Sequence, residues 1–238
     1  MKNAAPLICA HAAVPCCEDQ PFLPPLTYQI NTGSLVCFLG QRFRTLNIYL
    51  QMLAGLAEAK SGLVEHFVEQ QITPAHSHFP GIAYLDYNST LLSVLNGLEN
   101  VKLPALYHQL GSRQQIDEQA QELLSQLQYD ADHKILPAFM TMLQKRHLLI
   151  ARALMLKPQM LFIENPFADL ELEEAAILGQ YLATLVKNKN ITLVTSNANL
   201  DFVQHYAQQI IYATGEDFQF FQQWQDFSHY KQQNRLKF

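Results

Sequence analysis

The chain has 238 residues with 49% hydrophobic and 16% charged side chains, and its formal net charge is -5. This length is ample for one large domain, and the high hydrophobic content excludes an intrinsically disordered protein. The negative charge, with basic residues dispersed along the chain, excludes a protein that binds nucleic acid through an electropositive surface.

The first residues of the chain are small and apolar after Lys2, but Pro6, His11 and Pro15 interrupt the run that a secretory signal needs. We therefore expect no signal peptide. The four cysteines have no spacing typical of a zinc ribbon or a disulfide framework, and we expect reduced thiols of a cytosolic protein. No run approaches the roughly 18 apolar residues that span a bilayer, so any membrane contact is expected through a partner.

Short apolar runs and helical periodicities alternate along the chain. A run that ends at Gly40 is followed by leucines at positions 46, 50, 53 and 56, which predicts a strand, a turn and a helix. Ile116, Ala120 and Leu123 share one face of an amphipathic helix. In chain order, the pattern predicts strands at residues 35–39, 82–85, 160–163, 191–195 and 210–213, and helices after residue 46 and at residues 114–128, 142–156 and 175–186.

This alternation predicts an α/β fold with a mostly parallel sheet covered by helices on both faces. We expect a single domain whose core comprises residues 1–87 and 156–216, with a helical subdomain inserted at residues 88–155. Residues 217–238 form a terminal helix or docking tail in this interpretation. The simpler expectation for the tail is that its aromatic side chains pack on the same domain; they are Phe218, Phe220, Phe221, Trp224 and Phe227.

Three stretches, in order and at the right distances, resemble one family over nearly the whole chain. GSLVCFLGQRFRTLNIYLQMLAGLAEAKSG resembles the first strand, phosphate loop and first helix of ABC-transporter ATP-binding subunits. LLSVLNGLENVKLPALYH resembles the segment after their Q-loop, and KRHLLIARALMLKPQMLFIENPFADLE resembles their signature helix, Walker B strand and D-loop. LNGLENV and ENPF are most similar to the ATPase of Mce-type lipid transporters, and lipoprotein-releasing and cell-division relatives come second.

The resemblance implies a RecA-like P-loop NTPase fold of the ABC nucleotide-binding type, with an N-terminal antiparallel β portion. It also implies a peripheral subunit at the inner face of the membrane, held there by a permease and paired with an active ABC ATPase subunit or a second copy. Leu91, Leu92, Val94, Leu95 and Leu98 lie where the family receives the permease's coupling helix. The competing interpretation is that these side chains are ordinary core of the helical subdomain.

The phosphate loop of the family is chemically absent from this chain. Such a loop needs glycines whose N–H groups converge on phosphate, a lysine for the β and γ phosphates, and a Ser/Thr hydroxyl for Mg²⁺. The glycine positions read Phe43 and Thr45, the lysine position reads Leu46 and the hydroxyl position reads Asn47; the whole vestigial loop is Gly40, Gln41, Arg42, Phe43, Arg44, Thr45, Leu46 and Asn47. The scarcity of glycine, 9 in the chain, fits this loss.

The other functional positions are also replaced. The Q-loop glutamine reads Tyr87, and the signature glycines read Met142 and Leu143 after Thr141. The Walker B pair reads Glu164 and Asn165, and an amide cannot accept a proton as a general base. The switch histidine falls at Ala198 or its neighbours, where no histidine stands. Because both halves of the family's composite site are lost, we expect no catalytic residue, no bound cofactor and no metal.

Three hypotheses follow. The first is a pseudo-ATPase, a structural or regulatory subunit of a membrane transporter, with lipids as the predicted substrate class. The second is an ABC ATP-binding subunit for lipid or lipoprotein transport that keeps nucleotide, with Mg²⁺, through altered contacts. The third is an ABC-fold interaction protein outside transport, recruited through the aromatic tail.

Two smaller patterns are predicted to be structural. His76 and His78 are predicted to lie in a surface loop, because no third metal ligand is near in sequence. Lys145, Arg146 and His147 are predicted to form a solvated helix face.

Overall fold

A computed structural model describes residues 5–17, 22–68, 71–74, 81–127, 129, 132–189, 191–196 and 199–236. The larger of its two sheets has six strands in the order β10-β9-β3-β8-β7-β6. Neighbouring strands from β9 to β6 are parallel, and β10 pairs antiparallel with β9. These strands are β3 (Leu35–Gly40), β6 (Ile82–Leu85), β7 (Met160–Glu164), β8 (Thr192–Ser196), β9 (Gln209–Ala213) and β10 (Phe218–Phe221). The predicted α/β fold and each of its five predicted strands are confirmed.

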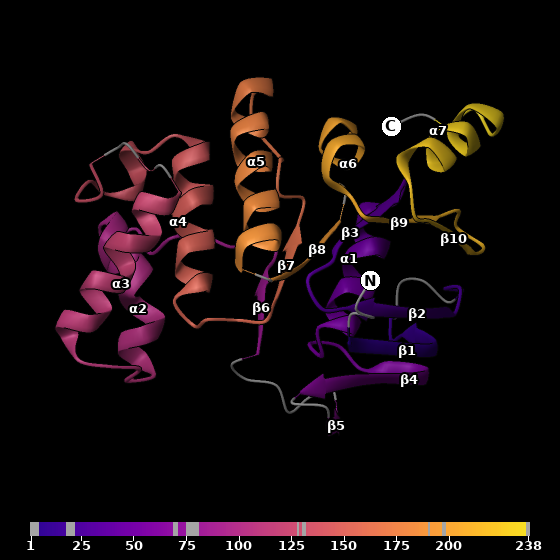
Figure 1. The fold of residues 1–238 in the computed structure, drawn as a ribbon, viewed down its shortest axis with the longest axis horizontal. Helices are drawn as coiled ribbons and strands as arrows, with labels where there is room; N and C mark the ends of the chain where they lie inside the picture. Colours follow the sequence, from indigo (N-terminus) through magenta and orange to yellow (C-terminus); the bar gives the residue numbers. More distant parts are fainter. Residues whose placement is uncertain are drawn as a thin grey trace.

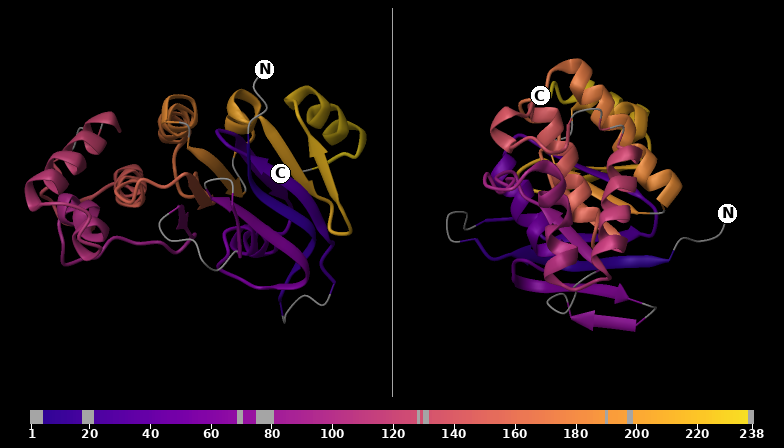
Figure 2. Two further views of the ribbon diagram at one scale, coloured as in Figure 1. Left: turned by 60° about the horizontal axis from the view of Figure 1, so that its bottom comes forward. Right: turned by 90° about the vertical axis from the view of Figure 1, so that its left-hand side faces the viewer.

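A smaller antiparallel sheet with the order β2-β1-β4-β5 supplies the N-terminal β portion. Its strands are β1 (Pro6–Pro15), β2 (Leu26–Asn31), β4 (Ala59–Val68) and β5 (Gln71–Pro74). Gly62 is required where β4 passes β1, because it has a φ of 76° and an added Cβ would lie 2.2 Å from the carbonyl oxygen of Ala12. Figures 1 and 2 show this sheet on one side of the larger one, with α1 (Phe43–Leu53) between them.

The helices cover the larger sheet and extend from one end of it. α2 (Gly97–Tyr107), α3 (Arg113–Gln126) and α4 (Met142–Leu154) pack together, and in Figure 1 α2 and α3 lie far from the small sheet. The short 3₁₀ helix η2 (Pro137–Phe139) precedes α4. α5 (Leu172–Lys189) and α6 (Leu200–Tyr206) cover the sheet face opposite α1, and α7 (Trp224–Gln233) closes the chain. No helix in the described ranges is long and apolar enough to cross a membrane.

Two apolar clusters fill the interior, one on each face of the six-stranded sheet. On one face, α1 places Leu46, Tyr49 and Leu50 in the layer between the two sheets. On the other, side chains of α4, α5 and α6 meet the alternate residues of β3, β7 and β8. This arrangement explains why β3, β7 and β8 are buried on both faces. It also explains why β3 and β7 read as continuous apolar runs in the sequence.

The first helix ends one turn earlier than its leucine spacing predicts. α1 stops at Leu53, Gly55 adopts a φ of 77°, and the N–H of Leu56 donates to the carbonyl of Gln51. This is a glycine-based helix termination. Leu56 therefore leaves the apolar face and is 63% exposed.

The C-terminal tail packs on its own domain. Phe218 and Phe227 are buried, and Phe227 lies between the rings of Tyr212, Phe221 and Trp224. The simpler expectation for this segment is confirmed for these side chains. The third hypothesis loses part of its structural support, because Phe218 and Phe227 are used inside the molecule, whereas Phe220 is 44% exposed.

Candidate functional site

The vestigial phosphate loop connects β3 to α1. Gly40 ends β3, Arg42 is the N-cap of α1 without a side-chain capping bond, and Phe43 is its first residue. The N–H groups of Thr45 and Leu46 donate to the carbonyl of Arg42 at 3.0 and 3.3 Å. Two backbone donors that a phosphate would need are thus used within the chain.

The loop's side chains point to different surroundings. Thr45 and Leu46 are buried, at 8% and 1% exposure, while Gln41, Arg42 and Arg44 are exposed. The side chain of Phe43 lies outside the described residues. The position that holds a lysine ammonium in the resembled family therefore carries an isobutyl group sealed in the core.

Glu164, at the carboxyl end of β7, is the centre of a buried hydrogen-bond network and is only 3% exposed. Its Oε1 accepts from the hydroxyl of Tyr84 at 2.6 Å and from Nε2 of Gln51 at 3.1 Å. Its Oε2 accepts from Nδ2 of Asn47 at 2.8 Å and from the backbone N–H of Tyr87 at 3.0 Å. Both carboxylate oxygens are therefore occupied by donors of the chain itself.

The network extends to the next strand through Asn47. Ser196, the last residue of β8, donates from Oγ to Oδ1 of Asn47 at 2.7 Å. The side-chain amide of Asn47 thus connects α1 to the ends of β7 and β8, with its nitrogen bonded to Glu164 and its oxygen bonded to Ser196. Burial raises the pKa of Tyr84, with the hydrogen bond to Glu164 and its charge acting in the same direction, so this tyrosine stays a donor.

Sequence reasoning identified Asn47 and Glu164 but missed Gln51, Tyr84 and Ser196. A signal was present: Asn47 and Gln51 are polar, stand four residues apart, and interrupt an otherwise apolar helix pattern. Residues at this spacing share one helix face, so two amides pointing at one acceptor were predictable in principle.

Two cavities flank the loop and have no lining residue in common. The smaller, about 290 Å³, lies beside Gly40, Arg42 and Thr45. The larger, about 800 Å³, lies at the carboxyl ends of β6, β7 and β8. Its lining residues are Arg44, Asn47, Tyr87, Asn88, Glu164, Asn165, Phe167, Ala168, Asp169 and Asn199.

Asn165 follows β7 directly and lines the larger cavity. Its φ is 44°, and its N–H donates to the carbonyl of Ser196 at 3.1 Å. The other predicted site residue of this edge, Ala198, lies outside the described residues, as do His76 and His78. In the part of the chain that is described, no group of three or more potential metal-ligating side chains gathers.

The vestigial signature forms the start of α4. Thr141 is the N-cap: its Oγ1 accepts from the N–H of Gln144, whose side chain accepts from the N–H of Thr141. This reciprocal capping box occupies helix-start donors that could otherwise face an anion. Met142 is 37% exposed and Leu143 packs partly against the core.

The predicted basic face of α4 is wrong. Arg146 and His147 are buried, at 9% and 5% exposure, because α4 is enclosed by α2, α3 and α5. Burial lowers the pKa of Arg146, and the nearby charge of Asp169 opposes this effect.

The predicted partner-binding residues divide into two groups. Leu91 and Leu98 pack partly on the core of the helical lobe, and Leu95 is half-buried. Leu92 and Val94 are 46% and 82% exposed. Contact with a partner stays a prediction for this segment, and the last two are the side chains available for it.

The exposed segment is held in shape by Asn100, which sequence reasoning did not single out. This residue is fully buried, accepts from the N–H of Leu92 at 2.7 Å, and donates to the carbonyls of Leu92, Leu95 and Asn96 at 3.0 to 3.1 Å. The loop that presents Leu92 and Val94 is therefore ordered by one side chain.

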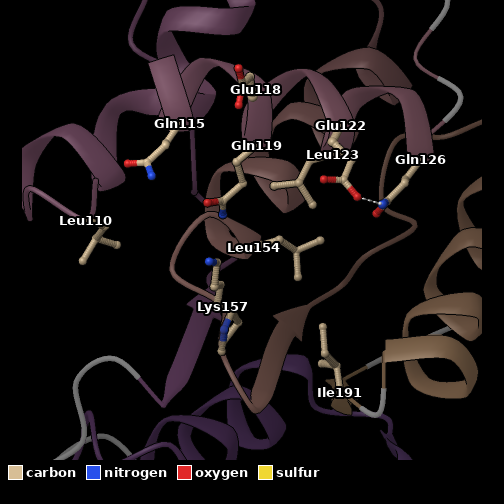
Figure 3. Close-up of a pocket in the computed structure, with 11 residues that line it drawn as sticks. Leu110, Gln115, Glu118, Gln119, Glu122, Leu123, Gln126, Leu154, Lys157 and Ile191 are labelled. Carbon is tan, nitrogen blue, oxygen red and sulfur yellow. Dashed lines mark hydrogen bonds between the residues drawn. The ribbon is translucent and has the colours of Figure 1, made fainter. Parts of the chain in front are cut away.

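A third cavity, about 660 Å³, lies at the opposite end of the strands. Figure 3 shows it between α3 and the turn after α4, where Lys157 extends toward Gln119. Pro158 and Ile191, which precede β7 and β8, also line it. Because Glu164 and Ser196 end these same strands, this cavity is separate from the network.

Comparisons with known proteins agree with the fold. Residues 24–168 match the sequence profile of the family described as ABC transporter. A sulfate/thiosulfate import ATP-binding protein of Shewanella oneidensis is 27% identical over 77% of this chain and 52% of its own length. A cytochrome c biogenesis ATP-binding export protein of Xylella fastidiosa is 27% identical over 82% of this chain and 88% of its own length.

A lipoprotein-releasing system ATP-binding protein of Treponema denticola is 26% identical over 74% of this chain and 80% of its own length. The chain spans about half the length of the first curated relatives it matches. Among solved structures, cbiO1 of Clostridium perfringens, part of the complex cbiONQ, has a TM-score of 0.83 at 14% identity, over 97% of this chain and 94% of that one. A dimeric ATP-binding cassette bound to ADP and Pi has a TM-score of 0.77 at 18% identity, over 91% and 98%.

Proposed function

The chain belongs to the ABC transporter family, and from this premise we propose that it is a non-catalytic subunit, a structural or regulatory component of a membrane transporter. The observation that carries the proposal is the occupation of both carboxylate oxygens of Glu164 by four donors of the chain. A carboxylate in this state has no oxygen left to hold a metal ion or its water.

Mg-ATP does not fit the residues present. Leu46 replaces a cation with a buried apolar group, and the N–H groups of Thr45 and Leu46 are engaged by Arg42. Losing two or three charge-assisted hydrogen bonds of roughly 1.5–3 kcal/mol each removes on the order of 5 kcal/mol. Since about 1.4 kcal/mol is a factor of ten, a micromolar site becomes millimolar or weaker. Asn165, at the general-base position, cannot take up a proton.

Two measurements test the absence of catalysis. We expect no ATP hydrolysis by the purified chain, alone or with its transporter partners, above that of a Glu164→Ala variant. We expect no heat of binding at millimolar Mg-ATP in calorimetry. Hydrolysis that vanished in Glu164→Ala would refute the proposal, and tight Mg-ATP binding would favour the alternative in which Arg42 and Arg44, both exposed, hold the phosphates.

We propose a permease as partner, with an ABC ATPase subunit or a second copy completing the assembly. Leu92 and Val94 support this, because they are exposed on a loop that Asn100 fixes. Such a partner would hold the chain at the inner face of the membrane. The lipid substrate class rests on LNGLENV at residues 95–101 and ENPF at residues 164–167.

The partner proposal is tested by co-purification with a candidate permease co-expressed with the chain. Leu92→Asp and Val94→Asp are expected to abolish co-purification while leaving the melting temperature unchanged. Leu172→Asp is the matched control, since this leucine is 81% exposed on α5. Equal capture of all variants would refute this contact surface.

A further inference from the structure

The larger cavity gathers four asparagines from four separate segments. Asn47 lies on α1, Asn88 follows β6, Asn165 follows β7, and Asn199 is the N-cap of α6. The carboxyl ends of neighbouring parallel strands bring these segments to one edge of the sheet. The volume of about 800 Å³ is within the range that accommodates small molecules.

Several of these amides keep hydrogen-bonding capacity. The side chains of Asn88 and Asn165 form no hydrogen bond to any residue that the structure describes. Asn199 uses its Oδ1 to accept from the N–H of Phe202 at 2.8 Å, and its Nδ2 is left over. Asn47 uses both its nitrogen and its oxygen, toward Glu164 and Ser196. The cavity thus offers the amide nitrogens of Asn88, Asn165 and Asn199 as donors. It offers the amide oxygens of Asn88 and Asn165 as acceptors.

The charges of the lining do not favour a polyanion. Among the lining residues that the structure describes, Arg44 is the one cation, Asp169 is an acid, and the carboxylate of Glu164 is occupied internally. The described lining also includes the apolar side chains of Phe167 and Ala168, so it offers a ligand both amide groups and apolar contact surface.

A primary amide both donates and accepts, as a hydroxyl group does. Tyr87, 45% exposed, adds an aromatic ring with a polar tip to the same lining. We propose that this cavity binds a neutral polyhydroxyl ligand, a sugar of one or two rings, hydrogen-bonded by Asn88, Asn165 and Asn199. Sugar binding and loss of ATP hydrolysis are separable properties of the chain.

The test uses the full chain with glucose, N-acetylglucosamine and maltose as probes, each at about 10 mM, in saturation-transfer NMR followed by calorimetry. We expect at least one of the three to bind with a dissociation constant in the millimolar range. Asn88→Ala and Asn165→Ala are each expected to weaken it about tenfold, or ~1.4 kcal/mol. Asn234→Ala, an exposed amide outside the cavity, is expected to leave it unchanged.

Each variant is first checked by its melting temperature, so that unfolding is not mistaken for lost contacts. The inference is overturned if none of the three sugars binds the wild-type chain. It is also overturned if an Asn88→Ala/Asn165→Ala double variant binds them as well as the wild-type chain does. ATP hydrolysis that vanishes in Glu164→Ala, beside retained sugar binding, would refute the non-catalytic proposal alone. If neither Mg-ATP nor any of the sugars binds, the sugar-binding inference is refuted and the non-catalytic proposal is unaffected.

Discussion

Removing the acceptor at the centre of the buried network should destabilise the chain. In Glu164→Ala, the hydroxyl of Tyr84 and the side-chain amides of Gln51 and Asn47 lose their partner, at present distances of 2.6, 3.1 and 2.8 Å. An unsatisfied buried donor costs about 1–3 kcal/mol. Because these three residues are half-buried rather than sealed, we take the lower end and expect a loss of about 3 kcal/mol.

For a domain of this length, 1 kcal/mol shifts the melting temperature by about 2–4 °C, so the expected decrease is about 6–12 °C. Glu164→Gln retains the shape and one acceptor oxygen, and should cost about half as much. The control is Glu118→Ala on the exposed face of α3, which loses one bond from Gln114 at 2.9 Å and should cost less than about 0.5 kcal/mol.

Calorimetric or circular-dichroism melting without nucleotide measures all three variants. The sign of the change in melting temperature distinguishes a carboxylate that is satisfied by internal hydrogen bonds from one that is kept available for a metal ion. A group held ready for a metal carries unrelieved negative charge in the metal-free protein, so its removal costs little or stabilises. A melting temperature of Glu164→Ala at or above that of the wild-type chain would refute the conclusion that hydrogen bonds within the chain satisfy this carboxylate.

Three further predictions concern the tail, the signature helix and alkaline pH. Phe227→Ala should destabilise the chain by about 3–5 kcal/mol in urea melts, since this ring is fully buried; a loss below about 1 kcal/mol would mean that the tail is detachable. Thr141→Ala should cost about 1 kcal/mol through the lost cap of α4, whereas Thr141→Ser should restore most of it. Burial raises the pKa of Cys37 from its usual 9.0 to about 12, so the unfolded chain releases this proton first. Stability should fall as pH rises from 9 toward 12, and Cys37→Ala should flatten that slope.

The parallel strands of the larger sheet were predictable, and burial on both faces leaves continuous apolar runs in β3 and β7. The prediction of a terminal helix or docking tail for residues 217–238 missed β10, which pairs with β9 at the sheet edge. The small sheet was accessible only through resemblance, since β1 contains two prolines and its pairing with β2 has two register shifts. The end of α1 was missed because the periodicity of leucines continues past Gly55, whose positive φ stops the helix. A helix end that is set by the backbone conformation of one glycine cannot be recognised from the spacing of apolar side chains.

At the candidate site, the missing chemical groups were visible in the sequence and their replacements were not. The resemblance predicts Leu46 and Asn165 to be losses from their positions alone. That Tyr84 and Gln51 close on Glu164 depends on three segments separated by more than 30 residues meeting at one strand end. The burial of Arg146 has the same origin, because helix packing, not charge pattern, decides which face of α4 is solvated.

The amide of Asn47 also has an evolutionary consequence. A serine or threonine hydroxyl at this position is shorter than the amide and carries a single proton, so it could not reach both Glu164 and Ser196 as the nitrogen and oxygen of Asn47 do. Restoring a lysine at Leu46 would place an ammonium in a site that is 1% exposed. Each single reversion lowers stability before any ligand contact can return. The residues now at this edge of the sheet therefore make a return to nucleotide binding difficult, because several of them would have to change at the same time.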